Sequence, residues 1–388
     1  MPETPRRHRG SVLRQGATLS LVFGAVLLAG AATGAWGDQS PGARRTSADV
    51  LPVAAPAPAL ATGQDPTGAQ LSAQQAENLL GASGDRWGAY YSAQEYAEFT
   101  QGLGGRYLGV GLSVGRGQDG VTAVSQVQPE GPAAVAGIAP GDRLLRIGED
   151  QADHLPVTEV VARLRGREGE RQVGSGVTLT VQRHDGPVRE VPLRRALLDS
   201  QQVAVERTPA GVVRITVRGF TSGVAQQVRA AVRGAKAGVV LDLRGNSGGL
   251  VEEAVGTASV FLDGGPVASY QERGERRELT AARGGDTTTP LVVLVDGGTM
   301  SAAELLTGAL QDRCRAVVVG ARTFGKGTVQ QPSRLADGAV LELTVGRYYT
   351  PAGRSPEGTG LAPDVLATEP GDAGELALRV LAGLGPGA

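Results

Sequence analysis

The chain has 388 residues, enough for two or three modest domains, and 41% of them are apolar, which is enough to build a core. Its 59 glycines and 22 prolines favour many short strands over long helical bundles. A formal net charge of −1, with no long basic stretch after the N-terminus, gives a nucleic-acid partner no electrostatic support. The single cysteine, Cys314, excludes an intrachain disulfide and a cysteine-based metal cluster, and its apolar setting predicts a buried side chain.

The N-terminus has the pattern of an export signal. Four arginines within the first 14 residues precede an apolar stretch at 17–36 that contains many small residues. A stretch of about 20 residues is also long enough to span a bilayer as an uncleaved anchor, with the basic flank inside. We therefore predict an exported protein, secreted or membrane-anchored, with a signal peptide or anchor at 1–36. The Ala- and Pro-rich residues 37–70 predict an extended linker.

Three further segments follow in chain order. Helically spaced apolar and aromatic residues predict two short helices within 71–103. Residues 104–198 predict a compact β unit with strands at 109–114, 121–127, 143–147, 177–182 and 188–193 and helices at 132–137 and 157–164. In 199–388, apolar strands alternate with helices, which predicts a parallel or mixed sheet. The strands are expected at 212–217, 238–243, 291–295, 316–319 and 340–348, and the helices at 223–233, 251–261, 301–314 and 375–384.

A candidate nucleophile stands where a buried strand meets a helix. Ser301 follows the strand 291–295 and a diglycine turn, and it begins the next helix. The N–H groups of a first helical turn lack intrahelical partners, and the helix dipole is positive there, as acyl transfer requires of an oxyanion site. The alternative is that Ser301 or Thr299 is an ordinary N-cap supported by Glu304.

A serine nucleophile needs a base, and the three histidines all precede residue 200, which excludes a Ser-His-Asp triad within this sheet. Only two lysines occur, Lys236 and Lys326, and Lys326 alone lies downstream of Ser301, in a glycine-flanked loop. Ser–Lys pairs operate on unrelated folds, provided that the lysine is desolvated enough to lose its proton. The alternative is a solvated loop lysine.

The same loop invites a nucleotide-binding interpretation. Residues Gly320 to Gly327 nearly fit the phosphate-binding pattern of glycine, four residues and Gly-Lys-Ser/Thr. Gly327 replaces the Ser/Thr that should hold Mg²⁺, and Thr328 comes one place late.

Several motifs, in the right order, resemble those of the carboxy-terminal processing (tail-specific) proteases. The resemblance covers about residues 71–365. Its motifs are Tyr96-Ala-Glu-Phe, Leu241-Asp-Leu-Arg-Gly-Asn-Ser-Gly-Gly249, Ala309-Leu-Gln-Asp, Thr323-Phe-Gly-Lys-Gly-Thr-Val-Gln330, Arg347-Tyr-Tyr-Thr-Pro-Ala-Gly-Arg354 and Gly360-Leu-Ala-Pro-Asp364. The resemblance implies a crotonase-like α/β protease core at 199–388, with a mixed sheet and helices, and an inserted, mostly β PDZ domain at 104–198. It implies no metal and no organic cofactor.

The resemblance also assigns roles by position. Ser301 matches the nucleophile, Lys326 its general base, and Gln330 the residue that orients the lysine. The backbone N–H groups of Gly248 and Ala302 match the oxyanion donors. Four residues of straight strand would place Gln330 about 13 Å from Lys326, so its role requires a turn between them.

Two positions depart from the family pattern, which usually has Ala before the nucleophile and Ser two places after it. Here these positions hold Met300 and Ala303. Neither has a proposed chemical role, so activity is not in doubt, although Met300 is placed to narrow the adjacent substrate site.

The β unit resembles a PDZ domain, whose carboxylate-binding loop would be residues 106–111. Its substrate-tail residues would be Tyr107, Leu108, Gly109, Val110 and Gly111, which open the strand along which a peptide adds. The helix at 157–164 would form the far wall of the groove. We hypothesise that this domain presents a tail to Ser301 or blocks access until a tail binds. The alternative is a β module that only packs on the core.

These expectations combine into one functional prediction. The chain would be a serine endopeptidase that cleaves exported proteins near their C-termini through an acyl-enzyme. Its partners would be proteins with exposed, apolar C-terminal tails, and the membrane if the N-terminal segment stays uncleaved. The sequence leaves a homo-oligomer open. The competing interpretations are a PDZ scaffold with a decayed protease body and the nucleotide-binding protein.

Overall fold

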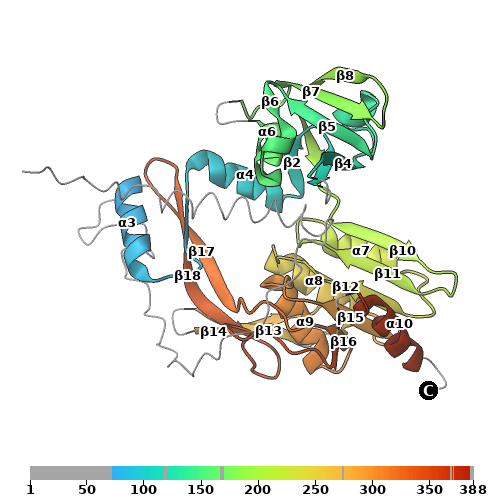
Figure 1. The fold of residues 1–388 in the computed structure, drawn as a ribbon. Coiled ribbons are helices and arrows are strands. Elements are labelled where there is room, and N and C mark those ends of the chain that lie inside the picture. The colour runs from blue at the N-terminus through green and yellow to red at the C-terminus, as the bar shows by residue number, and fades with distance from the viewer. Residues whose placement is uncertain are drawn as a thin grey trace, which may run out of the picture. The chain divides into compact units, whose positions relative to one another are not determined.

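The computed structural model describes residues 72–116, 120–166, 170–272, 275–367, 369 and 371–384. The predicted signal or anchor and the linker lie outside these residues, so they stay predictions. Within the described part of the chain, no helix is both long and apolar enough to cross a membrane. The described residues form two compact units, which we name the β unit (106–200) and the α/β unit (72–105 with 201–384) (Figure 1).

The β unit is built on an antiparallel sheet with one helix beside its edge. The strand order is β3 (Leu112–Arg116), β4 (Thr122–Val127), β5 (Asp142–Ile147), β7 (Gly176–Arg183) and β8 (Val188–Arg194), with β6 (Asp150–Gln151) beside β5. Two strands, β2 (Arg106–Gly109) and β9 (Ala196–Asp199), pair separately. The helical elements are α5 (Pro132–Val135), η1 (Ala152–His154) and α6 (Val157–Arg165). Val114, Leu144, Leu179, Val181 and Val160 lie in its apolar core.

The strand predicted at 109–114 is wrong, because the chain breaks it into two strands. β2 ends at Gly109, and Gly111 adopts a φ of 79°, a left-handed conformation that only glycine reaches at little cost. β2 then leaves the main sheet and pairs with β9.

The α/β unit begins with the two helices that the sequence predicts, α3 (Ala73–Ser83) and α4 (Ala93–Leu103). Each starts on a serine capping box, at Ser72 and Ser92. Between the helices lies a short strand that the sequence did not predict, β1 (Ala89–Tyr91). It pairs with a long strand near the other end of the chain, β18 (Val340–Tyr349), and so fixes this N-terminal segment to the rest of the unit.

The main sheet of this unit is mixed, as predicted. Its strand order is β10 (Val203–Arg207), β11 (Val213–Val217), β12 (Val239–Asp242), β15 (Leu291–Val295), β16 (Val317–Gly320) and β19 (Val365–Leu366). Every neighbouring pair is parallel except β10 with β11. The helices are α7 (Val224–Val232), α8 (Val251–Phe261), α9 (Ala302–Asp312) and α10 (Ala373–Gly383).

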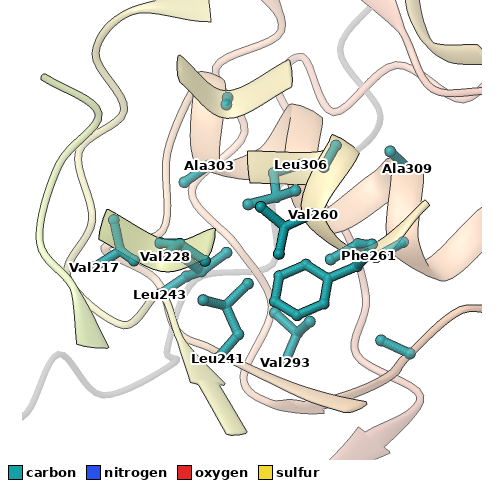
Figure 2. Close-up of a cluster of buried hydrophobic side chains, with 14 of the residues drawn as sticks. Val217, Val228, Leu241, Leu243, Val260, Phe261, Val293, Ala303, Leu306 and Ala309 are labelled. Atoms are coloured by element: carbon teal, nitrogen blue, oxygen red, sulfur yellow. The ribbon is translucent and has the colours of Figure 1, made fainter. Parts of the chain in front are cut away.

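Side chains alternate between two apolar cores along the central strands. Leu241 and Val293 point into the core under α7, α8 and α9, where Phe261 and Leu306 also lie (Figure 2). Their strand neighbours Val240 and Val292 point to the opposite face, which α10 covers. Burial on both faces is why these strands read as continuous apolar runs.

A second sheet of the α/β unit contains β1, β18 and two hairpins. Its other strands are β13 (Pro266–Glu272), β14 (Glu275–Thr280) and β17 (Thr328–Arg334). β13, β14 and β17 carry many polar residues, and none of these three was among the predicted strands. The prediction that Cys314 is buried is wrong. Cys314 is exposed with a φ of 51°, because α9 ends at Asp312 and the chain turns there in a left-handed conformation.

Candidate active site

Ser301 is held in a strained backbone conformation at the N-cap of α9. Its φ of 57° and ψ of −119° lie where a residue with a Cβ is disfavoured by about 1–2 kcal/mol. Such strain persists only where the surroundings over-determine it, and it concentrates at functional sites. The predicted N-cap alternative is thus correct about position, but an ordinary cap needs no such backbone.

The carboxylate of Glu304 ties Ser301 to Lys326. It is fully buried and accepts four hydrogen bonds. One oxygen accepts from the backbone N–H groups of Ser301 (3.0 Å) and Lys326 (2.8 Å). The other accepts from the Thr323 hydroxyl (2.6 Å) and the Gly325 N–H (2.8 Å). Burial raises the pKa of Glu304, and these four donors lower it in part. The Glu304 side chain therefore sets the spacing between the backbones of Ser301 and Lys326, the two predicted catalytic residues.

The hydroxyl of Tyr348 makes a second tie between the same two residues. It lies 2.7 Å from the carbonyl oxygen of Ser301 and 2.7 Å from that of Lys326, and its one proton is shared between them. Tyr348 is buried, which raises its pKa well above the usual value and keeps this hydroxyl protonated. Both the N–H and the C=O of Ser301 and of Lys326 are thus fixed by common partners.

The amine of Lys326 lies in a partly desolvated setting. Its Nζ is 5.0 Å from the ring centroid of Trp87. Burial lowers the pKa of Lys326, while the negative charges of Glu342, Glu357 and Asp85 oppose this shift. A lysine with a lowered pKa holds more neutral amine near neutral pH, which a general base needs.

Glu342 shares this setting. Its carboxylate lies 3.5 Å from the Tyr91 hydroxyl, and burial raises the pKa of Glu342 while the charge of Lys326 lowers it. Asp85 anchors the N-terminal segment here, since its carboxylate accepts from the N–H (2.7 Å) and hydroxyl (2.9 Å) of Thr344. Sequence reasoning missed the pairs Tyr91–Glu342 and Asp85–Thr344 because the members of each pair lie more than 200 residues apart along the chain.

The turn that contains Gly248 lies directly against Ser301. A Cβ placed on Gly248 would lie 2.9 Å from the Ser301 Cβ and 3.2 Å from the Ala302 nitrogen. Asn246 holds this turn, because its backbone carbonyl accepts from the Met300 N–H (2.8 Å) and its side-chain oxygen accepts from the Gly248 N–H (2.9 Å). The predicted oxyanion donor on Gly248 is thus engaged by Asn246 in this structure.

Gln330 lies on β17, so the expected turn between it and Lys326 is wrong. β17 begins at Thr328, and a bulge interrupts its pairing between Val329 and Gln330. The Gln330 amide donates to the hydroxyls of Thr328 (2.7 Å) and Thr344 (3.3 Å). The bulge changes the local strand geometry in a way that a straight-strand estimate does not include.

The loop that resembles a phosphate-binding loop has its N–H groups committed to carboxylates. Those of Gly325 and Lys326 donate to Glu304, and that of Gly327 donates to Glu357 at 2.7 Å. A phosphate-binding loop needs these donors free for the ligand. The structure therefore does not favour nucleotide binding here.

In the β unit, the predicted carboxylate-binding residues precede β3, an edge strand of the described sheet. α6 packs against β2 and β3, so a strand-adding peptide would lie between β3 and this helix. The Tyr107 hydroxyl donates to the Gln128 side chain (2.9 Å), and the Val110 carbonyl accepts from the Ala133 N–H (3.0 Å).

Comparisons with known proteins identify the family. The model of peptidase family S41 matches residues 210–367, and the PDZ domain model matches residues 99–182. The carboxy-terminal-processing protease of Bartonella bacilliformis is 31% identical over 310 residues, which cover 76% of this chain and 70% of that protein. The chain belongs to the carboxy-terminal processing proteases of peptidase family S41. The predicted family membership is confirmed, and so is the prediction of an α/β protease fold with a PDZ domain.

Two further similar proteins are covered to different shares of their own length. A probable CtpA-like serine protease of Staphylococcus epidermidis is 30% identical over 298 residues, and the alignment covers 74% of this chain but 58% of that relative. Among solved structures, a photosystem II D1 C-terminal processing protease is 28% identical with a TM-score of 0.49, over 80% of this chain and 87% of that one.

Proposed function

We propose that this S41-family chain is a serine endopeptidase that forms an acyl-enzyme on Ser301, with Lys326 as general base. The observation that carries the proposal is the double tie between the two residues through Glu304 and Tyr348. These four contacts fix the relative position of the two residues through their backbone N–H and C=O groups. A preorganised nucleophile and base is the arrangement that acyl transfer requires.

In the proposed reaction, neutral Lys326 takes the proton from the Ser301 hydroxyl as its oxygen attacks the scissile carbonyl. The lysine ammonium then gives that proton to the leaving amine nitrogen, and the acyl-enzyme forms. Water, deprotonated by the same amine, releases the acyl group and regenerates Ser301. Lys326 is thus base and acid in turn.

The negative oxygen of the tetrahedral intermediate would be held beside Gly248. The Ala302 N–H is a first-turn donor without an intrahelical acceptor, at the positive end of the α9 dipole. The Gly248 N–H would serve as second donor after leaving Asn246, and glycine keeps the space open for the oxygen. We propose that Gln330 orients Lys326, acting through the threonine hydroxyls that its amide contacts.

We also propose that substrates are exported proteins with apolar C-terminal tails, captured by the PDZ domain between β3 and α6. A free α-carboxylate would be bound by the loop before β3. Peptides with an amidated C-terminus should therefore lose affinity relative to the free acid. Export, with the N-terminal segment cleaved or retained as an anchor, completes the proposal and rests on the sequence of residues 1–36.

The decisive experiment compares turnover of a tailed peptide by wild type, Ser301→Ala and Lys326→Ala, with cleavage products identified by mass spectrometry. Both variants should lose turnover by about 10⁴-fold or more, as when a serine nucleophile or its general base is removed from other proteases. Lys236→Ala is the matched control, since Lys236 is exposed and is the chain's other lysine. Turnover that is unchanged in Ser301→Ala would remove the serine from the mechanism and favour the scaffold interpretation.

A further inference from the structure

An exposed aromatic ring lies in the loop of the proposed base. Phe324 precedes Lys326 by two residues, and 38% of its surface is exposed. Its backbone N–H donates to the Thr299 carbonyl (3.0 Å), so the backbone that carries the ring is fixed next to Ser301. The ring therefore lies at the surface and not in the core.

The Phe324 ring contacts a second aromatic side chain. Its centroid lies 5.8 Å from that of Trp87, with the rings tilted by 58°. Trp87 in turn lies 5.0 Å from the Lys326 Nζ, and its indole N–H is 3.4 Å from Glu357. An apolar surface thus begins at the proposed base and extends outward to Phe324.

The chemistry of the base indicates which part of a substrate reaches this surface. Lys326 has to give its proton to the leaving nitrogen, which must come within about 3 Å of Nζ. That nitrogen belongs to the residue that follows the scissile bond. The side chain of the same residue branches from the Cα that is bonded to this nitrogen, within reach of an aromatic ring whose centroid is 5.0 Å from Nζ.

We propose that Phe324 and Trp87 form the subsite for the residue that follows the scissile bond, and that they select a large apolar side chain there. This inference rests on the proposed function, because it takes Lys326 to be the proton donor to the leaving group. It adds a specificity at the cleavage site itself, separate from tail recognition by the PDZ domain.

The charges around the two rings favour an apolar over an acidic occupant. Glu342, Glu357 and Asp85 all act on Lys326. The Arg86 guanidinium, 4.5 Å from the Trp87 ring centroid, is the one further cation that the described contacts place on this aromatic pair. Three carboxylates against two cations give this surface a net negative charge, which disfavours an acidic substrate side chain.

The test uses the full chain and three peptides that differ only in the residue after the scissile bond, which is Phe, Gly or Asp. Wild type should prefer Phe over Gly by about tenfold or more in kcat/KM, as apolar subsites do, and should cleave the Asp peptide most slowly. Phe324→Ala should reduce the Phe/Gly ratio to near one. Trp87→Phe should keep most of it.

Phe99→Ala is the matched control. Phe99 lies in the same N-terminal segment and stacks on Tyr91 at 5.4 Å, whereas the described ring contact of Phe324 is with Trp87, so the Phe99 variant should keep the wild-type ratio. A second peptide pair that varies the residue before the scissile bond should show the same ratio in wild type and Phe324→Ala.

The outcomes separate the two proposals. Ser301-dependent turnover with an unchanged Phe/Gly ratio in Phe324→Ala would overturn the subsite and leave the proposed function intact. An equal loss of the ratio in Phe99→Ala would also overturn it, since the effect would then come from the segment's packing. Turnover that does not depend on Ser301 would instead refute the proposed function.

Discussion

Replacing Gly248 with alanine tests the oxyanion site with a single methyl group. The new Cβ would lie 2.9 Å from the Ser301 Cβ and 2.9 Å from the Met300 carbonyl oxygen, whereas carbon contacts are ordinarily about 3.5–4.0 Å. The residue also has a φ of 96°, which costs alanine about 1–2 kcal/mol. The turn must therefore move away from Ser301 by roughly 0.5–1 Å.

The expected loss follows from that displacement. A misplacement of about 1 Å costs on the order of 10²-fold in rate, and removal of one oxyanion donor costs about 10²–10³-fold. We expect kcat of Gly248→Ala to fall by about 10²–10³-fold, with the free energy of unfolding lowered by about 1–3 kcal/mol. Because the negative oxygen develops only after the substrate has bound, ground-state binding is retained and KM should change little.

The assay measures initial rates on a tailed peptide and the denaturant midpoint of each variant. Gly297→Ala is the control, because a Cβ there meets nothing within 4 Å, although Gly297 lies in the turn that leads from β15 to Ser301. If Gly248→Ala kept a kcat within about threefold of Gly297→Ala while folded, the assignment of this space to the oxyanion would be refuted.

Three further predictions concern the base, the tie and the β unit. Activity should rise as pH rises through the pKa of Lys326, because only the neutral amine accepts a proton, and the midpoint of this rise in kcat/KM should lie below the ordinary lysine pKa of 10.5. Lys326→Arg should abolish activity, since arginine does not deprotonate. Activity in that variant would contradict the role of Lys326 as base. In Glu304→Gln, the amide NH2 would face two hydrogen-bond donors in either orientation of the side chain, because each carboxylate oxygen of Glu304 accepts from two donors. Chemical denaturation should show a stability loss of about 2–4 kcal/mol, and rate measurements should show a reduced kcat. Arg195 is 3% exposed and donates to the carbonyl groups of Leu164 and Arg163 at the end of α6, so Arg195→Met should cost about 2 kcal/mol by calorimetry, whereas an unchanged midpoint would show that water replaces it.

Much of the fold was predictable because local pattern and tertiary environment agree. β15 and α8 have the predicted bounds, since the strand is buried on both faces and the helix carries one continuous apolar side. β13 and β14 were missed because their strands carry charged residues and take their structure from pairing with each other and with β18. A hairpin of that kind has little local signal.

The sequence by itself determined the order of the motifs, the mixed α/β core with its PDZ domain, and the choice of Ser301 and Lys326 as candidates, because motif order, the absence of histidines after residue 200 and the rarity of lysine can be read directly from a linear chain. Only the tertiary structure decided what surrounds them. Glu304 and Tyr348 join the two residues. Trp87, which precedes the PDZ domain in the sequence, lies next to Lys326, which follows that domain. Such contacts depend on which distant segments fold together, and side-chain pattern carries no record of that pairing.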